Sequence, residues 1–266
     1  MSMIFFFQSI WASPSESDLS AAIELFNTHA YAKVPLPEKD QLKSILSGKV
    51  VKMVDRSNGD DEPRRALGFY YTPLPRELIW IASQDPHFVV QESTTELLMS
   101  GSKDRLRWYG HIDLPWPFSN RHWVVDVWNN HQLAQKTNGQ CWEHPWKKVE
   151  NGLDQIMPLI AKNAIPSLSE KDLEDAIYTP YNQGALATIS FENSEQKNDG
   201  TLIIYHATTV IGGDVPESLI LQLTYAGLDK FLKDLEERGK DKVTTHYTSG
   251  HQPIYSGEGT PLKPYP

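Results

Sequence analysis

The sequence contains one cysteine, fewer basic than acidic side chains and no long apolar run. Cys141 stands alone in 266 residues, which excludes an internal disulfide framework and leaves any structural zinc site to histidines and carboxylates. Lys and Arg number 25 against 34 Asp and Glu, so a formal net charge of −9 lacks the positive field that binds nucleic acids. No segment reaches the roughly 20 apolar residues of a membrane-spanning helix. We therefore predict a soluble protein that binds no nucleic acid.

The first twelve residues determine which cellular compartment is expected. Residues 4–7 are apolar, but Gln8 and Ser9 interrupt the run and no basic residue precedes it. The segment therefore lacks the charged start and the continuous apolar stretch of a secretory signal. A cytoplasmic location is favoured, and a secreted or periplasmic one would follow if these residues are the remnant of a signal.

Apolar side chains make up 39 % of the chain, enough to bury a substantial core in one large domain or two small ones. Alternation and β-branched or aromatic residues predict strands over residues 48–56, 65–71, 94–100, 106–113, 122–128, 140–148, 185–191 and 201–210. Helical spacing predicts helices near residues 18–26 and 42–46, and over 77–83, 154–163, 169–178 and 215–238. Short breaks between the strands favour antiparallel pairing, which makes the chain an α+β protein.

The same patterns divide the chain into three parts. Residues 1–47 contain two short amphipathic helices and are expected to pack on the domain as an N-terminal helical segment. Residues 48–239 contain every predicted strand and the longest helix, which Asp214 and Glu217 are expected to cap and Gly239 to end. Residues 240–266, with four prolines, form a tail that either lies along the surface or is disordered.

Two segments carry a family resemblance. Residues 114–121 read Leu-Pro-Trp-Pro-Phe-Ser-Asn-Arg and run into a strand, and residues 212–218 read Gly-Gly-Asp-Val-Pro-Glu-Ser and open the longest helix. Both resemble START domains, the lipid-binding modules related to steroidogenic acute regulatory protein. The resemblance covers roughly residues 48–238. It implies a helix-grip fold, in which a curved antiparallel sheet wraps around the long C-terminal helix and leaves an elongated apolar tunnel.

Alternation along the strands predicts which residues face such a tunnel, because successive side chains point to opposite faces of a sheet. We place the more apolar set of each strand inward. The strand residues expected to contact a ligand are Trp108, Ile112, Trp123, Val125, Val127, Ala187 and Ile189.

The longest helix is expected to form the opposite wall of the tunnel. Its apolar stripe consists of Ile220, Leu223, Thr224, Gly227, Leu228 and Phe231. Small residues inside a bulky stripe leave room for a ligand, or else Gly227 lets the helix approach the sheet closely. Both interpretations predict that a large side chain at position 227 is damaging.

Aromatic and charged residues near the tunnel mouth complete the predicted site. Six of the eight tryptophans lie within residues 108–146, and Trp116 is included because aromatic walls suit a rigid apolar ligand. If Arg121 points inward it would anchor the polar end of a lipid, and if it points outward it would pair with a neighbouring acid. Residues 115–117 and 212–213 are the candidate gates.

Sequence motifs for catalysis and cofactor binding are missing. There is no His-Glu-x-x-His, no Gly-x-Ser-x-Gly, no P-loop and no Gly-x-Gly-x-x-Gly. We expect no catalytic residue, metal or cofactor, and a non-enzymatic protein that binds a lipid or sterol with transient membrane contact. A cyclase- or aromatase-like enzyme is the alternative, which requires His111 and Asp113 to face the tunnel. A third interpretation is a regulatory domain with a filled interior, in which Trp108 and Trp123 pack directly on Phe231.

Overall fold

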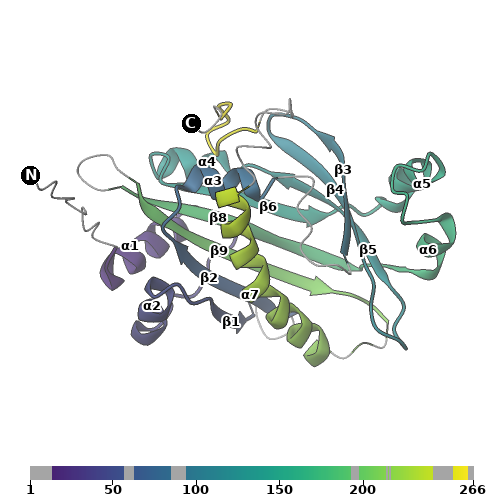
Figure 1. The fold of residues 1–266 in the computed structure, drawn as a ribbon, viewed down its shortest axis with the longest axis horizontal. Helices are drawn as coiled ribbons and strands as arrows, with labels where there is room; N and C mark the ends of the chain where they lie inside the picture. Colours follow the sequence, from purple (N-terminus) through teal and green to yellow (C-terminus); the bar gives the residue numbers. More distant parts are fainter. Residues whose placement is uncertain are drawn as a thin grey trace, which may run out of the picture.

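The computed structural model describes residues 14–56, 63–84, 94–192, 198–213, 215, 217–241 and 254–262. Its strands form one sheet in the order β1-β2-β9-β8-β6-β5-β4-β3, antiparallel throughout, and β7 adds a short parallel pair beside β5 (Figure 1). The strands are β1 (Val51–Asp55), β2 (Arg65–Thr72), β3 (Thr94–Gly101), β4 (Arg105–Ile112), β5 (Arg121–Trp128), β6 (Cys141–Lys148), β7 (Ile177–Tyr178), β8 (Tyr181–Glu192) and β9 (Asn198–Val210). The helices are α1 (Glu16–Asn27), α2 (Lys39–Leu46), α3 (Arg76–Ala82), α4 (His131–Lys136), α5 (Leu153–Ala161), α6 (Glu170–Asp175) and α7 (Glu217–Asp241).

The long helix α7 lies across one face of the sheet, which we call the inner face (Figure 1). A Cβ atom built on Gly68 of β2 would lie 2.9 Å from the side chain of Leu232, so glycine at this position lets the helix approach the sheet closely. Two residues further along β2, the hydroxyl of Tyr70 donates a hydrogen bond to Glu236 of α7. Helix α3 packs beside α7 on the same face.

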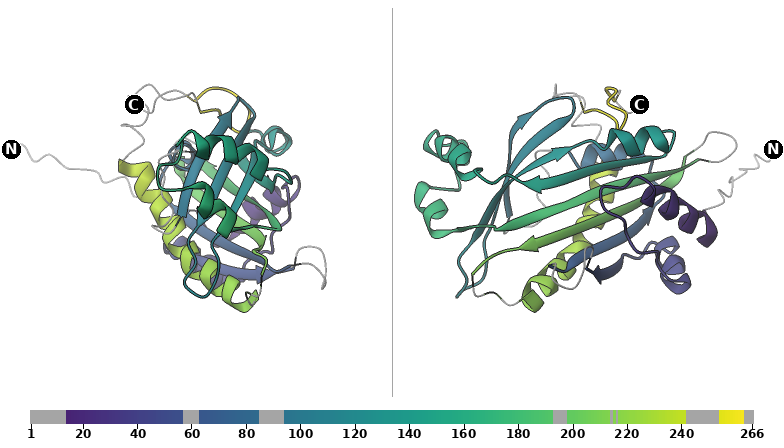
Figure 2. Two further views of the ribbon diagram at one scale, coloured as in Figure 1. Left: turned by 90° about the vertical axis from the view of Figure 1, so that its right-hand side faces the viewer. Right: turned by 180° about the vertical axis from the view of Figure 1, so that it is seen from behind.

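Helices cover the opposite, outer face of the sheet in two places (Figure 2). The apolar sides of α1 and α2 pack on β2, β8 and β9, with Phe26 and Ile45 fully buried against Phe69. The buried carboxyl of Glu143 accepts a hydrogen bond from the backbone N–H of Tyr31 at 2.9 Å and so fastens the segment after α1. Helices α5 and α6 cover the outer face of β3, β4 and β5.

The α+β fold, with a curved antiparallel sheet and a long C-terminal helix, is confirmed, as are the strands predicted from alternation. Gly239 does not end the longest helix, since α7 continues to Asp241. The helix predicted over residues 169–178 is shorter, because residues 177–178 form β7. Helix α4 was not predicted, and the proposed cap at Asp214 lies outside the described residues.

Part of the C-terminal tail lies along the surface of the sheet-and-helix body. Ile254 is buried against Trp80 and Trp142, and the indole N–H of Trp80 donates to the carbonyl of Tyr255 at 2.8 Å. Of the two alternatives for the tail, residues 254–262 follow the first. Across the residues that the structure describes, no helix combines the length and the apolar content needed to cross a membrane.

Candidate functional site

The inner face has one packed half and one open half. Where β2, β8 and β9 meet α3 and α7, inward side chains such as Tyr70, Leu186 and Ile203 are buried against Leu232 and Leu235. On β3, β4 and β5 most inward side chains keep solvent-accessible surface although most are apolar, and Val125, a predicted contact residue, is buried among them. We call this second region the open inner face, and its strand residues are Glu96, Leu98, Leu106, Trp108, Ile112, Trp123 and Val127.

Contacts on the outer face fix the direction of these side chains. Tyr109 and Val124 are buried under α5 and α6, so their sequence neighbours Trp108 and Trp123 must point to the inner face. The strand register agrees, since Trp108 pairs with Val125. The inward placement predicted for β4 and β5 from alternation is therefore confirmed.

The sheet is strongly curved around the open inner face. In the sheet order, four strands stand between β9 and β3, which would separate them by roughly 24 Å if the sheet were flat. Charges that far apart are screened at physiological salt, where the Debye length is about 8 Å. Burial nevertheless is not the only cause of the raised pKa of Tyr205 on β9, since the negative charge of Glu96 on β3 raises it further. The direction of this shift agrees with a sheet that is rolled rather than flat (Figure 2).

A row of aromatic rings separates the packed half from the open one. The ring of Tyr205 lies 5.4 Å from Trp146 of β6 and 5.0 Å from Phe231 of α7, measured between centroids. Trp108 and Trp123 remain half-buried rather than sealed against the helix. This arrangement disagrees with the interpretation in which those two tryptophans are packed solid on Phe231.

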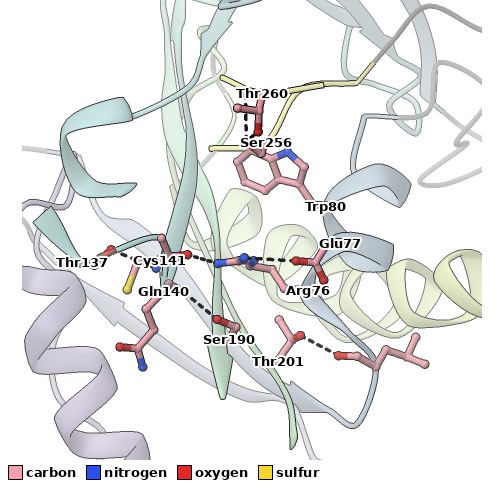
Figure 3. A network of polar contacts seen from close by, with 12 residues as sticks. Arg76, Glu77, Trp80, Thr137, Gln140, Cys141, Ser190, Thr201, Ser256 and Thr260 are labelled. Atoms are coloured by element: carbon pink, nitrogen blue, oxygen red, sulfur yellow. Dashed lines mark hydrogen bonds and ion pairs between the residues drawn. The ribbon is translucent and has the colours of Figure 1, made fainter. Parts of the chain in front are cut away.

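Helix α3 closes one end of the inner face with stacked rings and with a polar network around Arg76, which Figure 3 shows. Trp80 stacks on His144 with ring centroids 3.7 Å apart, and burial lowers the pKa of His144 to about 3, so this histidine is neutral. The guanidinium of Arg76 lies over the Trp142 ring at 3.5 Å and pairs with Glu77. This end is filled by the protein's own side chains.

Arg121 closes the other end by binding backbone carbonyls. Its side chain is 2 % exposed and donates hydrogen bonds to the carbonyls of Ser119, Asn120, Ile211 and Gly212. Neither alternative considered for Arg121 describes this arrangement, because its partners are neither a ligand nor an acid. It ties the loop before β5 to the segment before α7, so the two candidate gates are joined to each other.

Three predicted contact residues lie away from the open inner face. Ala187 and Ile189 point to the outer face, where they pack in the cluster formed with α1 and α2. The prediction was wrong because both faces of β8 are covered, and the more apolar set faces the larger outer core. Trp116 is 92 % exposed on the loop before β5, so it does not form a wall of the inner face.

The helix residues of the predicted site have mixed outcomes. Ile220, Thr224 and Gly227 are half-buried, and the hydroxyl of Thr224 donates back to the carbonyl of Ile220 at 2.9 Å. Phe231 packs on Tyr205, as described above. The side chain of Leu223 lies outside the part of the chain that the structure describes.

The polar residues that the enzyme alternative requires do not face α7. His111 and His122 are direct cross-strand partners on the outer face, each 1 % exposed, and burial lowers the pKa of His122 to about 4. Asp113 is exposed beyond the end of β4, with its carboxylate 3.7 Å from the imidazole of His111. Among the described residues, no group of histidine, cysteine, aspartate and glutamate is arranged to hold a metal ion.

Two polar residues of the inner face were not predicted: Glu96 on the open inner face and Tyr205 in the row of rings at its border. Glu96 alternates with Leu97, which packs under α5 and α6, so an outward apolar residue identifies the glutamate as inward-facing. Tyr205 stands on the same face as Ile203 in a strand that is apolar on both sides. The sequence therefore identifies Glu96 as inward-facing only once the positions of α5 and α6 on the outer face are known.

Comparison with known proteins gives the fold its name. No protein-family model matches the sequence, and no curated protein matches it. Among solved structures, human STARD10 is similar with a TM-score of 0.54 at 12 % identity, covering 83 % of this chain and 86 % of that one. A STAR-related lipid transfer protein fragment from Xanthomonas axonopodis has a TM-score of 0.51 at 15 % identity and covers 72 % and 94 % respectively. Human StAR-related lipid transfer protein 5 has a TM-score of 0.50 at 12 % identity and covers 85 % and 96 %. The chain therefore has the helix-grip fold of START domains.

Proposed function

We propose that the protein binds one hydrophobic molecule, a lipid or sterol, between α7 and the open inner face. The observation that carries this proposal is the partial exposure of apolar side chains on the face of the sheet that α7 crosses, among them Trp108, Trp123 and Val127 (Figure 1). Exposing such residues costs free energy, which an apolar ligand would recover. Similarity to lipid transfer proteins in fold supports the proposal.

Binding is favoured over the cyclase- or aromatase-like alternative by the direction of the histidines. An acid-base mechanism built on His111 and Asp113 needs both to reach the substrate. They lie on or beyond the outer side of β4, with His111 buried. The inner face offers mainly apolar walls, as a carrier or storage protein requires.

Loading and release would include transient contact with a membrane. Trp116 is 92 % exposed on the loop whose carbonyls Arg121 binds, and tryptophan favours the membrane interface. Cosedimentation with phosphatidylcholine vesicles tests this step, and Trp116→Ala should reduce the bound fraction. Equal cosedimentation of the variant and the wild type would contradict the membrane contact through this loop.

The ligand itself is sought by extracting the purified protein with organic solvent and identifying the extract by mass spectrometry. Lipid classes are then titrated while displacement of the neutral dye N-phenyl-1-naphthylamine is followed by fluorescence. Leu98→Trp would fill the open inner face and should abolish dye binding, whereas Glu174→Trp on the exposed side of α6 should not. Absence of co-purified lipid together with no response to any lipid class would refute the proposal.

A further inference from the structure

Three polar groups on the inner side of the sheet have no partner among the residues that the structure describes. The carboxyl of Glu96, the hydroxyl of Tyr205 and the indole N–H of Trp123 form no hydrogen bond or ion pair in the part of the chain that the structure describes. None of them is a buried atom either, so each can reach solvent or a ligand. Polar groups left open inside an apolar surface are the usual means of orienting a bound molecule.

The three groups are brought together by the register of β3, β4 and β5. Glu96 pairs with Gly110, and Gly110 pairs with Trp123. A Cβ on Gly110 would lie 2.4 Å from the Trp123 ring, so the indole lies over the glycine and leans toward the strand that carries Glu96. Tyr205 stands on the inner side of β9, in the row of rings formed with Trp146 and Phe231, and the charge of Glu96 contributes to its raised pKa.

The carboxyl of Glu96 lies on the inner side of β3, next to the strand over which the Trp123 ring lies. The side chain of Glu96 is exposed to solvent, yet removal of surrounding water by the protein raises its pKa to about 7. The carboxyl is therefore accessible to a ligand and also less well hydrated than a carboxyl on the outer surface.

Three positively charged side chains of the inner face are already engaged. Arg121 donates to four backbone carbonyls, and Lys148 pairs with Glu150 at 2.9 Å. Lys52, on the inner side of β1, donates to the carbonyl of Tyr225 at 3.1 Å. An anionic ligand would therefore meet the glutamate without a free cation among the described residues of this face.

We propose that Glu96 and Tyr205 form a polar subsite that binds a hydroxyl or amine at the polar end of the hydrophobic ligand and rejects a carboxylate. This inference rests on the proposed function, because it names the class of molecule that the open inner face accepts. The ligand group donates a hydrogen bond to the Glu96 carboxylate, and the Tyr205 hydroxyl and the Trp123 N–H are free to complete its coordination.

Three probes that share one chain length and differ only in the polar group distinguish the effect of the polar end from that of the apolar tail. Hexadecanol, hexadecylamine and hexadecanoate each compete with N-phenyl-1-naphthylamine at pH 8, where Glu96 is ionised. We expect the alcohol and the amine to bind at least about tenfold more tightly than the carboxylate. Whichever of the two binds more tightly identifies the polar group that the subsite takes.

Substitutions assign this preference to the subsite. Glu96→Gln should weaken amine binding about tenfold and bring the carboxylate to within about threefold of the alcohol. Tyr205→Phe should weaken alcohol binding several-fold, about the effect of one hydrogen bond, and provides a second test if Glu96→Gln fails to fold. Glu174→Gln, which removes an exposed carboxylate from α6, should leave all three affinities unchanged.

Two negative results have different meanings. If the dye binds and all three probes displace it equally, or if Glu96→Gln keeps the wild-type order of affinities, the subsite is refuted while ligand binding stands. If neither the dye nor any probe binds, the proposed function itself fails and the subsite fails with it.

Discussion

Replacing Arg121 by methionine should destabilise the protein strongly, although the substitution keeps a long, flexible side chain. The arginine is 2 % exposed and its guanidinium donates to four carbonyls, those of residues 119, 120, 211 and 212. Methionine fills similar space without a donor, so these carbonyls must find water or stay unpaired. The two segments that Arg121 joins, before β5 and before α7, should then separate.

The size of the loss follows from the number of hydrogen bonds and from their exposure. A hydrogen bond with a charged partner contributes about 1.5–3 kcal/mol, and an unpaired buried acceptor costs about 1–3 kcal/mol. Ser119 is exposed, so water can replace the arginine at that carbonyl. Burial also disfavours the charged guanidinium, which offsets part of the gain. We expect Arg121→Met to reduce the free energy of unfolding by about 3–5 kcal/mol.

Urea unfolding followed by circular dichroism measures this difference. Arg105→Met is the matched control, because the Arg105 side chain is 64 % exposed and its nearest carboxylate, on Asp126, is 3.9 Å away. The control should lose less than about 1 kcal/mol. Hydrogen exchange at residues 211–213 should accelerate in Arg121→Met alone. A loss below about 1 kcal/mol for Arg121→Met, or unchanged exchange at those residues, would show that the carbonyl contacts do not hold the two segments together.

Three further substitutions test the packing and the buried charges. Gly110→Ala should force the Trp123 ring from its place and lower dye affinity, since a Cβ would lie 2.4 Å from that ring; unchanged Trp fluorescence and affinity would contradict this. Tyr70→Phe should reduce the free energy of unfolding in urea by about 1–2 kcal/mol, because Glu236 then keeps Lys240 as a donor but loses the Tyr70 hydroxyl. An unchanged free energy of unfolding would show that this contact does not help to hold α7 on the sheet. Burial lowers the pKa of His122 from 6.5 to about 4, so the unfolded chain binds a proton that the folded chain does not. The contribution of neutral His122 to the free energy of unfolding is therefore fully present above pH 6.5 and is lost as the pH falls to about 4, a loss of about 3 kcal/mol. The free energy of unfolding of His122→Phe should fall less over this pH range. Equal falls in the variant and the wild type would refute the assignment to His122.

Local sequence patterns predicted the elements well because each pattern has a local physical cause. The apolar spacing Leu19, Ala22, Ile23 and Phe26 gave α1, and all four residues are buried in its core-facing side. Gly48 follows α2 with φ of +74°, the left-handed conformation expected where a helix stops at glycine. Gly239 was misread because α7 is held at that point by its packing on α3, where Leu74 and Ile79 lie against it.

Face assignment succeeded or failed according to what covers each face of a strand. On β4 and β5 the inward set of side chains is the more apolar one, so alternation alone placed Trp108 and Trp123 correctly. On β8 the outer set is the more apolar one, because α1 and α2 bury it, and the rule that the more apolar set faces the ligand selected Ala187 and Ile189 from the wrong side.

Glu96 shows why polarity along one strand cannot identify a binding residue by itself. A glutamate between Thr95 and Leu97 reads as a solvent-facing residue of an amphipathic strand, and Glu96 is indeed exposed. The structure changes the meaning of that exposure, because α5 and α6 bury the alternate residue Leu97 on the outer side. The water that reaches Glu96 is therefore the water that a ligand would displace, and the contact that identifies it comes from helices more than 50 residues further along the chain. Sequence periodicity predicts which residues share a face of a strand. Whether that face packs in the core, faces solvent or contacts a ligand depends on elements that are distant in the chain.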